Sequence, residues 1–213
     1  MQALDRTIID SNWITILLVV LLGCIFLLKG ISVKRLKGTA FSFLNITSIE
    51  DEIEENNSFL NVFQSVLFLF SVVVLALLLY KFLLLYTVSI EQGFYTFIKV
   101  ISFVFSYFIA KRLLEFLFSR LFLINKQVKF FLFSKSIYLY SVSLFLLIGL
   151  ILVEYSQLNT VFLIYFSVIL FSIRFLLHVL NNKKLILNEL FYFILYLCAF
   201  EIAPLFILFK LLF

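Results

Sequence analysis

Long apolar runs separated by short polar segments make up most of this sequence. A helix that crosses a bilayer needs about 20 mostly apolar residues, whereas the strands of a membrane barrel are shorter and alternate polar with apolar positions. The runs are long and do not alternate, so they predict helices. We expect an all-α polytopic membrane protein, a single domain over residues 1–213 with about six spans at residues 13–28, 59–86, 94–110, 137–153, 158–180 and 190–213.

Composition agrees with this pattern and excludes several classes of protein. The 213 residues are 64% hydrophobic and 14% charged, with a mean hydropathy of +1.18. A soluble domain is about 45–50% apolar and about 25% charged. The excess of apolar residues excludes a soluble enzyme and a disordered chain. The two cysteines, Cys24 and Cys198, are too few for a disulfide framework.

The basic residues indicate an orientation in the membrane. Most of the 17 lysines and arginines fall between the first and second spans, between the third and fourth, or just after the fifth. Cytoplasmic loops carry an excess of lysine and arginine. We therefore expect cytoplasmic loops at residues 29–58 and 111–136, with both termini on the other side. This arrangement predicts a multi-pass membrane protein.

One group of basic residues is expected to bind anionic lipid headgroups, which attract basic side chains near the membrane surface. The group comprises Lys111, Arg112, Arg120, Lys126, Lys129 and Lys135. Nucleic acid is not expected as a partner, because the aromatic residues lie in the apolar spans rather than among the basic residues. The acidic run at residues 50–55 has two interpretations, a solvated lead-in to the second span or a docking surface for a basic partner.

Ionisable residues inside the spans are candidate functional groups, because they are costly in hydrocarbon. Glu201 lies about 12 residues into the sixth span, or about 18 Å at 1.5 Å per residue, close to the midplane. Arg174 in the fifth span is its expected partner, and Lys99 in the third span is the alternative. The pair could lock helix register, Glu201 could bind a proton or substrate, or it could pair with another subunit. Pro204, one turn later, is expected to kink the helix.

The third span also carries a polar stripe, formed by Tyr95, Lys99, Ser102 and Ser106. This spacing places all four on one side of a helix, which we expect to face the interior of the bundle. His178 is interpreted as an interfacial histidine. No metal site or cofactor is expected, and no catalytic motif of a known type is present.

The C-terminal string Tyr-Leu-Cys-x-x-Glu-Ile-x-Pro-Leu, at residues 196–205, resembles the ending of a family of uncharacterised integral membrane proteins from Bacteroidota. The family is known only as a domain of unknown function. The resemblance implies the inner membrane of a two-membrane bacterium and supplies no activity. That bacterial group uses envelope machines for protein secretion and gliding, so a link to such a machine is implied by association only.

These observations favour a non-enzymatic accessory or scaffold subunit of an envelope complex, with other membrane protein subunits as partners. The alternative is a small proton-coupled carrier or channel-like element centred on Glu201. A third class, a membrane enzyme acting on lipid, would have His178, Arg174 and Tyr192 as its candidate residues.

Overall fold

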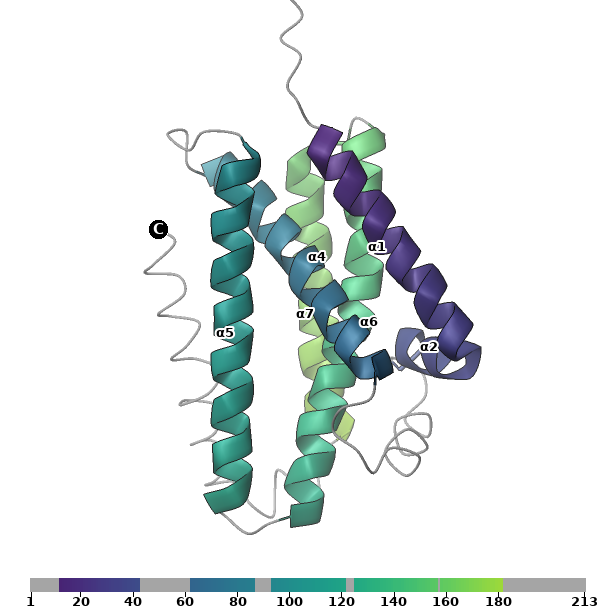
Figure 1. Ribbon diagram of the computed structural model, residues 1–213, viewed down its shortest axis with the longest axis vertical. Helices are drawn as coiled ribbons and strands as arrows, with labels where there is room; N and C mark the ends of the chain where they lie inside the picture. Colours follow the sequence, from purple (N-terminus) through teal and green to yellow (C-terminus); the bar gives the residue numbers. More distant parts are fainter. Residues whose placement is uncertain (1–11, 43–61, 87–92, 122–124, 157, 182–213) are drawn as a thin grey trace, which may run out of the picture.

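The computed structural model describes residues 12–42, 62–86, 93–121, 125–156 and 158–181, and this part of the chain is helical without strands. Five long helices and one short helix follow one another along it (Figure 1): α1 Asn12–Ile31, α2 Val33–Ala40, α4 Val62–Tyr86, α5 Phe94–Leu121, α6 Asn125–Tyr155 and α7 Thr160–Asn181. The expectation of an all-helical chain is therefore confirmed for the described residues.

Five segments are long and apolar enough to cross a membrane, and they correspond to the first five predicted spans. They are Trp13–Ile31, Val62–Leu85, Phe94–Leu113, Phe133–Tyr155 and Thr160–Leu177. The sixth predicted span, 190–213, lies outside the described residues. The structure thus supports a membrane protein with at least these five candidate spans.

The predicted cytoplasmic loop at residues 111–136 is largely helical in the structure. Helix α5 continues to Leu121 and α6 already begins at Asn125. The polar residues in this stretch mark the point where the chain loses its apolar character, but lysine, arginine and glutamate favour helix nearly as well as leucine. A rise in polarity therefore marks the end of a membrane span without marking the end of a helix.

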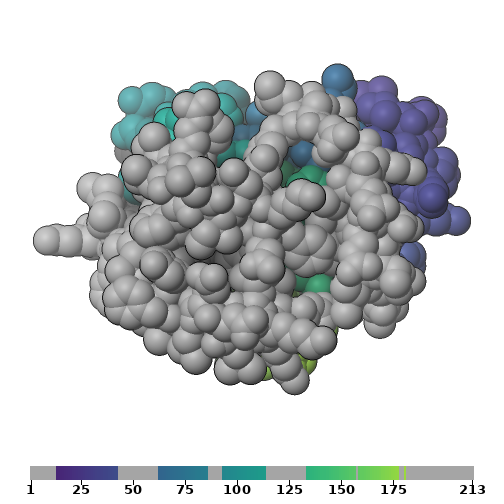
Figure 2. Space-filling model, turned by 90° about the horizontal axis from the view of Figure 1, so that it is seen from below, coloured from purple at the N-terminus to yellow at the C-terminus, as the bar shows by residue number. Residues whose placement is uncertain are grey.

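Helices α4 and α6 form the centre of the bundle, and α1, α5 and α7 lie around them. In the most apolar stretch of each helix, 56% of α4 and of α6 is buried, against 22% of α1 and 17% of α5 and of α7. Consecutive long helices run in opposite directions, so α1, α5 and α7 end where α4 and α6 begin (Figure 1). Seen from that end, residues 12–42 lie at the edge of the molecule (Figure 2).

Helices α6 and α7 approach closely at Gly149. A Cβ atom at this position would lie 2.8 Å from Cδ1 and 2.9 Å from Cε1 of Phe166. The Phe166 ring is in turn stacked on Phe162, with 5.9 Å between ring centroids. The absence of a side chain at residue 149 therefore lets α7 pack against α6, as small residues do in membrane helix pairs.

We expect Gly149→Ala to destabilise the bundle by about 1–2 kcal/mol, because overpacking a helix contact costs more than alanine gains as a helix former. Gly23→Ala is the matched control, since a Cβ there meets nothing within 4 Å. Unfolding in mixed detergent micelles measures both variants. Equal stability of the two variants would contradict close packing at Gly149.

Candidate functional site

An ion pair joins the two central helices near one end of the bundle. Nζ of Lys81 in α4 lies 2.7 Å from Oε2 of Glu154 in α6. Their side chains are only 20% and 15% exposed. Because α4 ends at Tyr86 and α6 at Tyr155, the pair lies at the end of the bundle where α1 and α5 begin.

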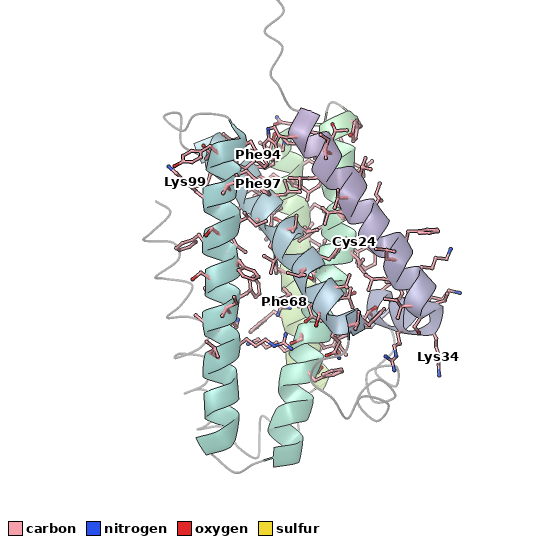
Figure 3. The ribbon with its side chains drawn as sticks, viewed as in Figure 1. Cys24, Lys34, Phe68, Phe94, Phe97 and Lys99 are labelled. Atoms are coloured by element: carbon pink, nitrogen blue, oxygen red, sulfur yellow. The ribbon has the colours of Figure 1, made fainter. Side chains whose placement is uncertain are left out.

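Aromatic side chains pack beside this ion pair. Tyr80, the residue before Lys81, is 2% exposed. Its ring packs edge-on against Trp13 of α1 at 5.3 Å between centroids, and against Phe97 of α5 at 6.0 Å. Phe94 completes the group by contacting Trp13 at 5.7 Å. Figure 3 shows Phe94 and Phe97 on the side of α5 that faces the other helices. The cluster ties α1, α4 and α5 together.

Sequence reasoning missed Glu154, although a signal for it existed. Lys81 stands out as a break in an apolar run, whereas Glu154 falls one residue beyond the predicted span 137–153. Both residues lie near the C-terminal ends of spans that run in the same direction, away from the basic segments. Opposite charges at one depth in two spans are candidates for pairing, and that comparison would have found this pair.

Arg174 and Lys99, the two cations considered as partners of Glu201, are held by other groups in the structure. Nη2 of Arg174 donates a hydrogen bond to the backbone carbonyl of Lys135 at 3.4 Å, which links α7 to α6. Nζ of Lys99 lies 4.6 Å from the centroid of the Tyr95 ring, a cation–π contact. Glu201 and Pro204 lie outside the described residues, as do Tyr192 and Cys198, so the proposed pairing remains a prediction.

The polar stripe on α5 forms one helix face, as its spacing predicts, but that face is exposed. Tyr95, Lys99, Ser102 and Ser106 are all exposed, whereas Phe97, Val100 and Val104 on the opposite side are buried. Lys99 points away from the other helices in Figure 3. The expectation that the stripe faces the interior is wrong for the described helices. The aromatic and aliphatic side of α5 packs against α4. The polar side, on the opposite face of α5, is therefore left exposed.

Basic residues gather at the end of the bundle opposite the Lys81–Glu154 pair. This end holds the C-terminal parts of α1, α5 and α7, the beginning of α6, and α2. Its described basic residues are Lys29, Lys34, Arg35, Lys37, Lys111, Arg112, Lys135 and Arg174. The expected clustering of positive charge between alternate spans therefore corresponds to one end of the folded molecule.

Residues of the predicted headgroup-binding set differ in their surroundings. Nζ of Lys111 lies 5.8 Å from the Tyr107 ring centroid, and the Arg112 guanidinium lies 5.5 Å from that of Phe68.

Lys135 is only 6% exposed, so its assignment to a headgroup surface does not fit the structure. It lies within the span Phe133–Tyr155 rather than in a loop. Arg120, Lys126 and Lys129 belong to α5 or α6, and their side chains, like that of His178, are not described.

Among the described residues, no three histidine, cysteine, aspartate or glutamate residues are grouped in a way that could hold a metal ion. Cys24, on α1, is a free thiol of intermediate exposure.

The whole amino-acid sequence, including the residues outside the described helices, can be compared with known proteins. No curated protein and no solved structure matches the chain. One family model matches residues 14–212, nearly the whole chain, and its description is a domain of unknown function, DUF4271. The chain therefore belongs to the DUF4271 family, and its described part is a helical bundle with five segments long and apolar enough to cross a membrane.

Proposed function

We propose that this protein is a non-enzymatic accessory or scaffold subunit of a complex in the bacterial inner membrane, with its basic end in the cytoplasm. The orientation follows from the excess of lysine and arginine at that end. A place in secretion or gliding machinery belongs to the same proposal, and it is supported only by the resemblance of the C-terminal string to Bacteroidota proteins. The outward polar face of α5 is the observation that carries the proposed function.

This face has the residue types that membrane helices use to bind one another. Ser102, Ser106 and Ala110 are exposed and spaced four apart, so they form one row of small side chains along α5. Small residues at this spacing let two helix backbones approach closely, and serine hydroxyls donate hydrogen bonds across the contact. By contrast, the exposed surfaces of α1 and α7 carry mostly bulky apolar side chains, as lipid contact favours.

Lys99 extends the same face toward the end of α5. It lies five residues after Phe94, or about 7 Å along the axis, so its amine can extend toward the membrane surface. A carboxylate or carbonyl on a neighbouring helix would be a stronger partner for this amine than the Tyr95 ring. We infer that the row of small residues, with Lys99 above it, packs against a helix of another membrane protein.

Site-specific photo-crosslinking in native membranes tests the proposed function. A photoreactive amino acid at Ser106 is expected to join the chain to a second membrane protein and to increase its apparent mass. The same group at Val20, a 55% exposed position on α1, serves as the matched lipid-facing control and is expected to give no such product. Products within the chain alone, or with lipid alone, at Ser106 would overturn the proposal.

A further inference from the structure

The corner between α1 and α2 has a defined backbone geometry. The Ser32 amide still donates to the carbonyl of Leu28 at 3.1 Å, which completes α1. Ser32 then adopts an extended conformation, and its Oγ accepts a hydrogen bond from the amide of Arg35 at 3.3 Å. A serine in this position satisfies an amide that the first turn of a helix leaves unpaired. The chain therefore turns sharply at Ser32 and begins α2 at once.

Helix α2 is fixed to the bundle on one side. Thr39 is 1% exposed, and Oγ of Ser141 in α6 donates a hydrogen bond to the carbonyl of Ala40 at 3.0 Å. Leu36 packs against the buried cluster that includes Leu28 and Phe63. These contacts hold a helix of only eight residues, which would not be stable alone.

The opposite side of the corner combines positive charge with apolar side chains. Lys29, Lys34 and Lys37 are exposed, and among the described residues none of them has an ion-pair partner. Ile31, Val33 and Phe41 lie in the same stretch of chain and are 52%, 45% and 56% exposed. Lys34 extends away from the bundle at the lower end of α1 (Figure 3), and residues 12–42 lie at the edge of the molecule seen from this end (Figure 2).

We propose that this corner, formed by Lys29, Lys34 and Lys37 with Ile31, Val33 and Phe41, is a binding site for the phosphate headgroup of an anionic phospholipid. The apolar side chains would enter the acyl boundary while the lysine amines extend to the headgroup layer. The corner belongs to α1 and α2, whereas the headgroup-binding residues predicted from the sequence belong to α5 and α6. The site does not depend on the proposed function, because it concerns lipid rather than a protein partner.

Charge removal at the corner tests this site. The purified full chain is titrated in neutral detergent with dioleoyl phosphatidylglycerol, and lipid adducts are counted by native mass spectrometry. A basic residue near an anionic surface contributes about 1 kcal/mol, which corresponds to about fivefold in affinity. Lys34→Gln is therefore expected to weaken binding about fivefold, and K29Q/K34Q/K37Q together about a hundredfold.

Two controls separate the corner from general effects of charge. Lys99→Gln, an exposed lysine near the other end of the bundle, removes the same charge and is expected to leave phosphatidylglycerol binding unchanged. Lys34→Arg keeps the charge and is expected to retain affinity. Equal losses in Lys34→Gln and Lys99→Gln, or unchanged phosphatidylglycerol binding in the triple variant with its helix content intact, would overturn the proposal.

Discussion

Replacing Glu154 with leucine is expected to destabilise the folded bundle by about 2–3 kcal/mol. The substitution leaves the Lys81 amine, 20% exposed, without its carboxylate partner at 2.7 Å. Breaking a buried ion pair by removing one partner costs about 3–5 kcal/mol, because an uncompensated charge stays buried. The expected value lies at or below the low end of that range, since both side chains keep some exposure. Unfolding by sodium dodecyl sulfate in mixed micelles measures the change.

The double variant Lys81→Met/Glu154→Leu is the control for this prediction. Replacing both members of a buried pair by apolar residues of similar size is often neutral or stabilising. We expect the double variant to recover most of the stability lost in Glu154→Leu. A double variant as unstable as the single one would show that Glu154 stabilises the bundle through contacts other than the ion pair.

The second large effect is expected at Leu28, where Leu28→Ala should destabilise the protein by about 2 kcal/mol. Leu28 is fully buried in a cluster with Phe63 and Leu67 of α4 and Tyr140 of α6, and Leu36 of α2 packs against it. Burial in a membrane protein gains little from leaving water, so the cost comes mainly from lost van der Waals contact and the cavity left behind. The same unfolding assay in mixed micelles measures it.

Leu27→Ala provides a control at nearly the same depth on the same helix. Leu27 is 63% exposed while its neighbour Leu28 is 0% exposed. A side chain that contacts lipid or detergent leaves no cavity when it is shortened, so we expect a change within about 0.5 kcal/mol. Comparable losses in the two variants would mean that α1 does not pack on α4 and α6 as the structure describes.

The Lys81–Glu154 pair explains how two opposite charges are tolerated within the ends of the central helices. An ionisable residue in a span marks a possible functional site, yet here each charge has its counterpart on the adjacent central helix. The pair joins α4 and α6 in one register, and this structural role is enough to account for the two charges. Its neighbours Tyr80, Trp13 and Phe97 extend that connection to α1 and α5.

Much of the architecture could be predicted because the bilayer acts on each segment separately. Apolar runs of sufficient length must become helices, since hydrocarbon offers no partner for backbone amides and carbonyls. That rule identified the regions of α1, α4, α5, α6 and α7 without any knowledge of their packing. The rule does not mark where the helices end, because α5 and α6 extend into residues 111–136, where hydropathy no longer requires a helix.

The partners of individual side chains could not be obtained in this way. The stripe through Ser102 and Ser106 was assigned to the interior because polar residues avoid lipid, yet α5 packs through Phe97, Val100 and Val104. Arg174 was expected to meet a carboxylate, and the structure gives it the carbonyl of Lys135 as one acceptor. Each of these outcomes depends on the rotation of a helix about its own axis.

The sequence by itself determined which of the described segments are long and apolar enough to cross a membrane and that positive charge gathers between alternate spans, because both follow from the residues of single segments. Only the tertiary structure decided that Lys81 pairs with Glu154, that the Phe166 ring packs against Gly149 and that the polar face of α5 is exposed. The physical reason is that lipid is about as apolar as leucine, so hydropathy does not distinguish the helix faces. Shape, small residues and paired charges select the contacts instead.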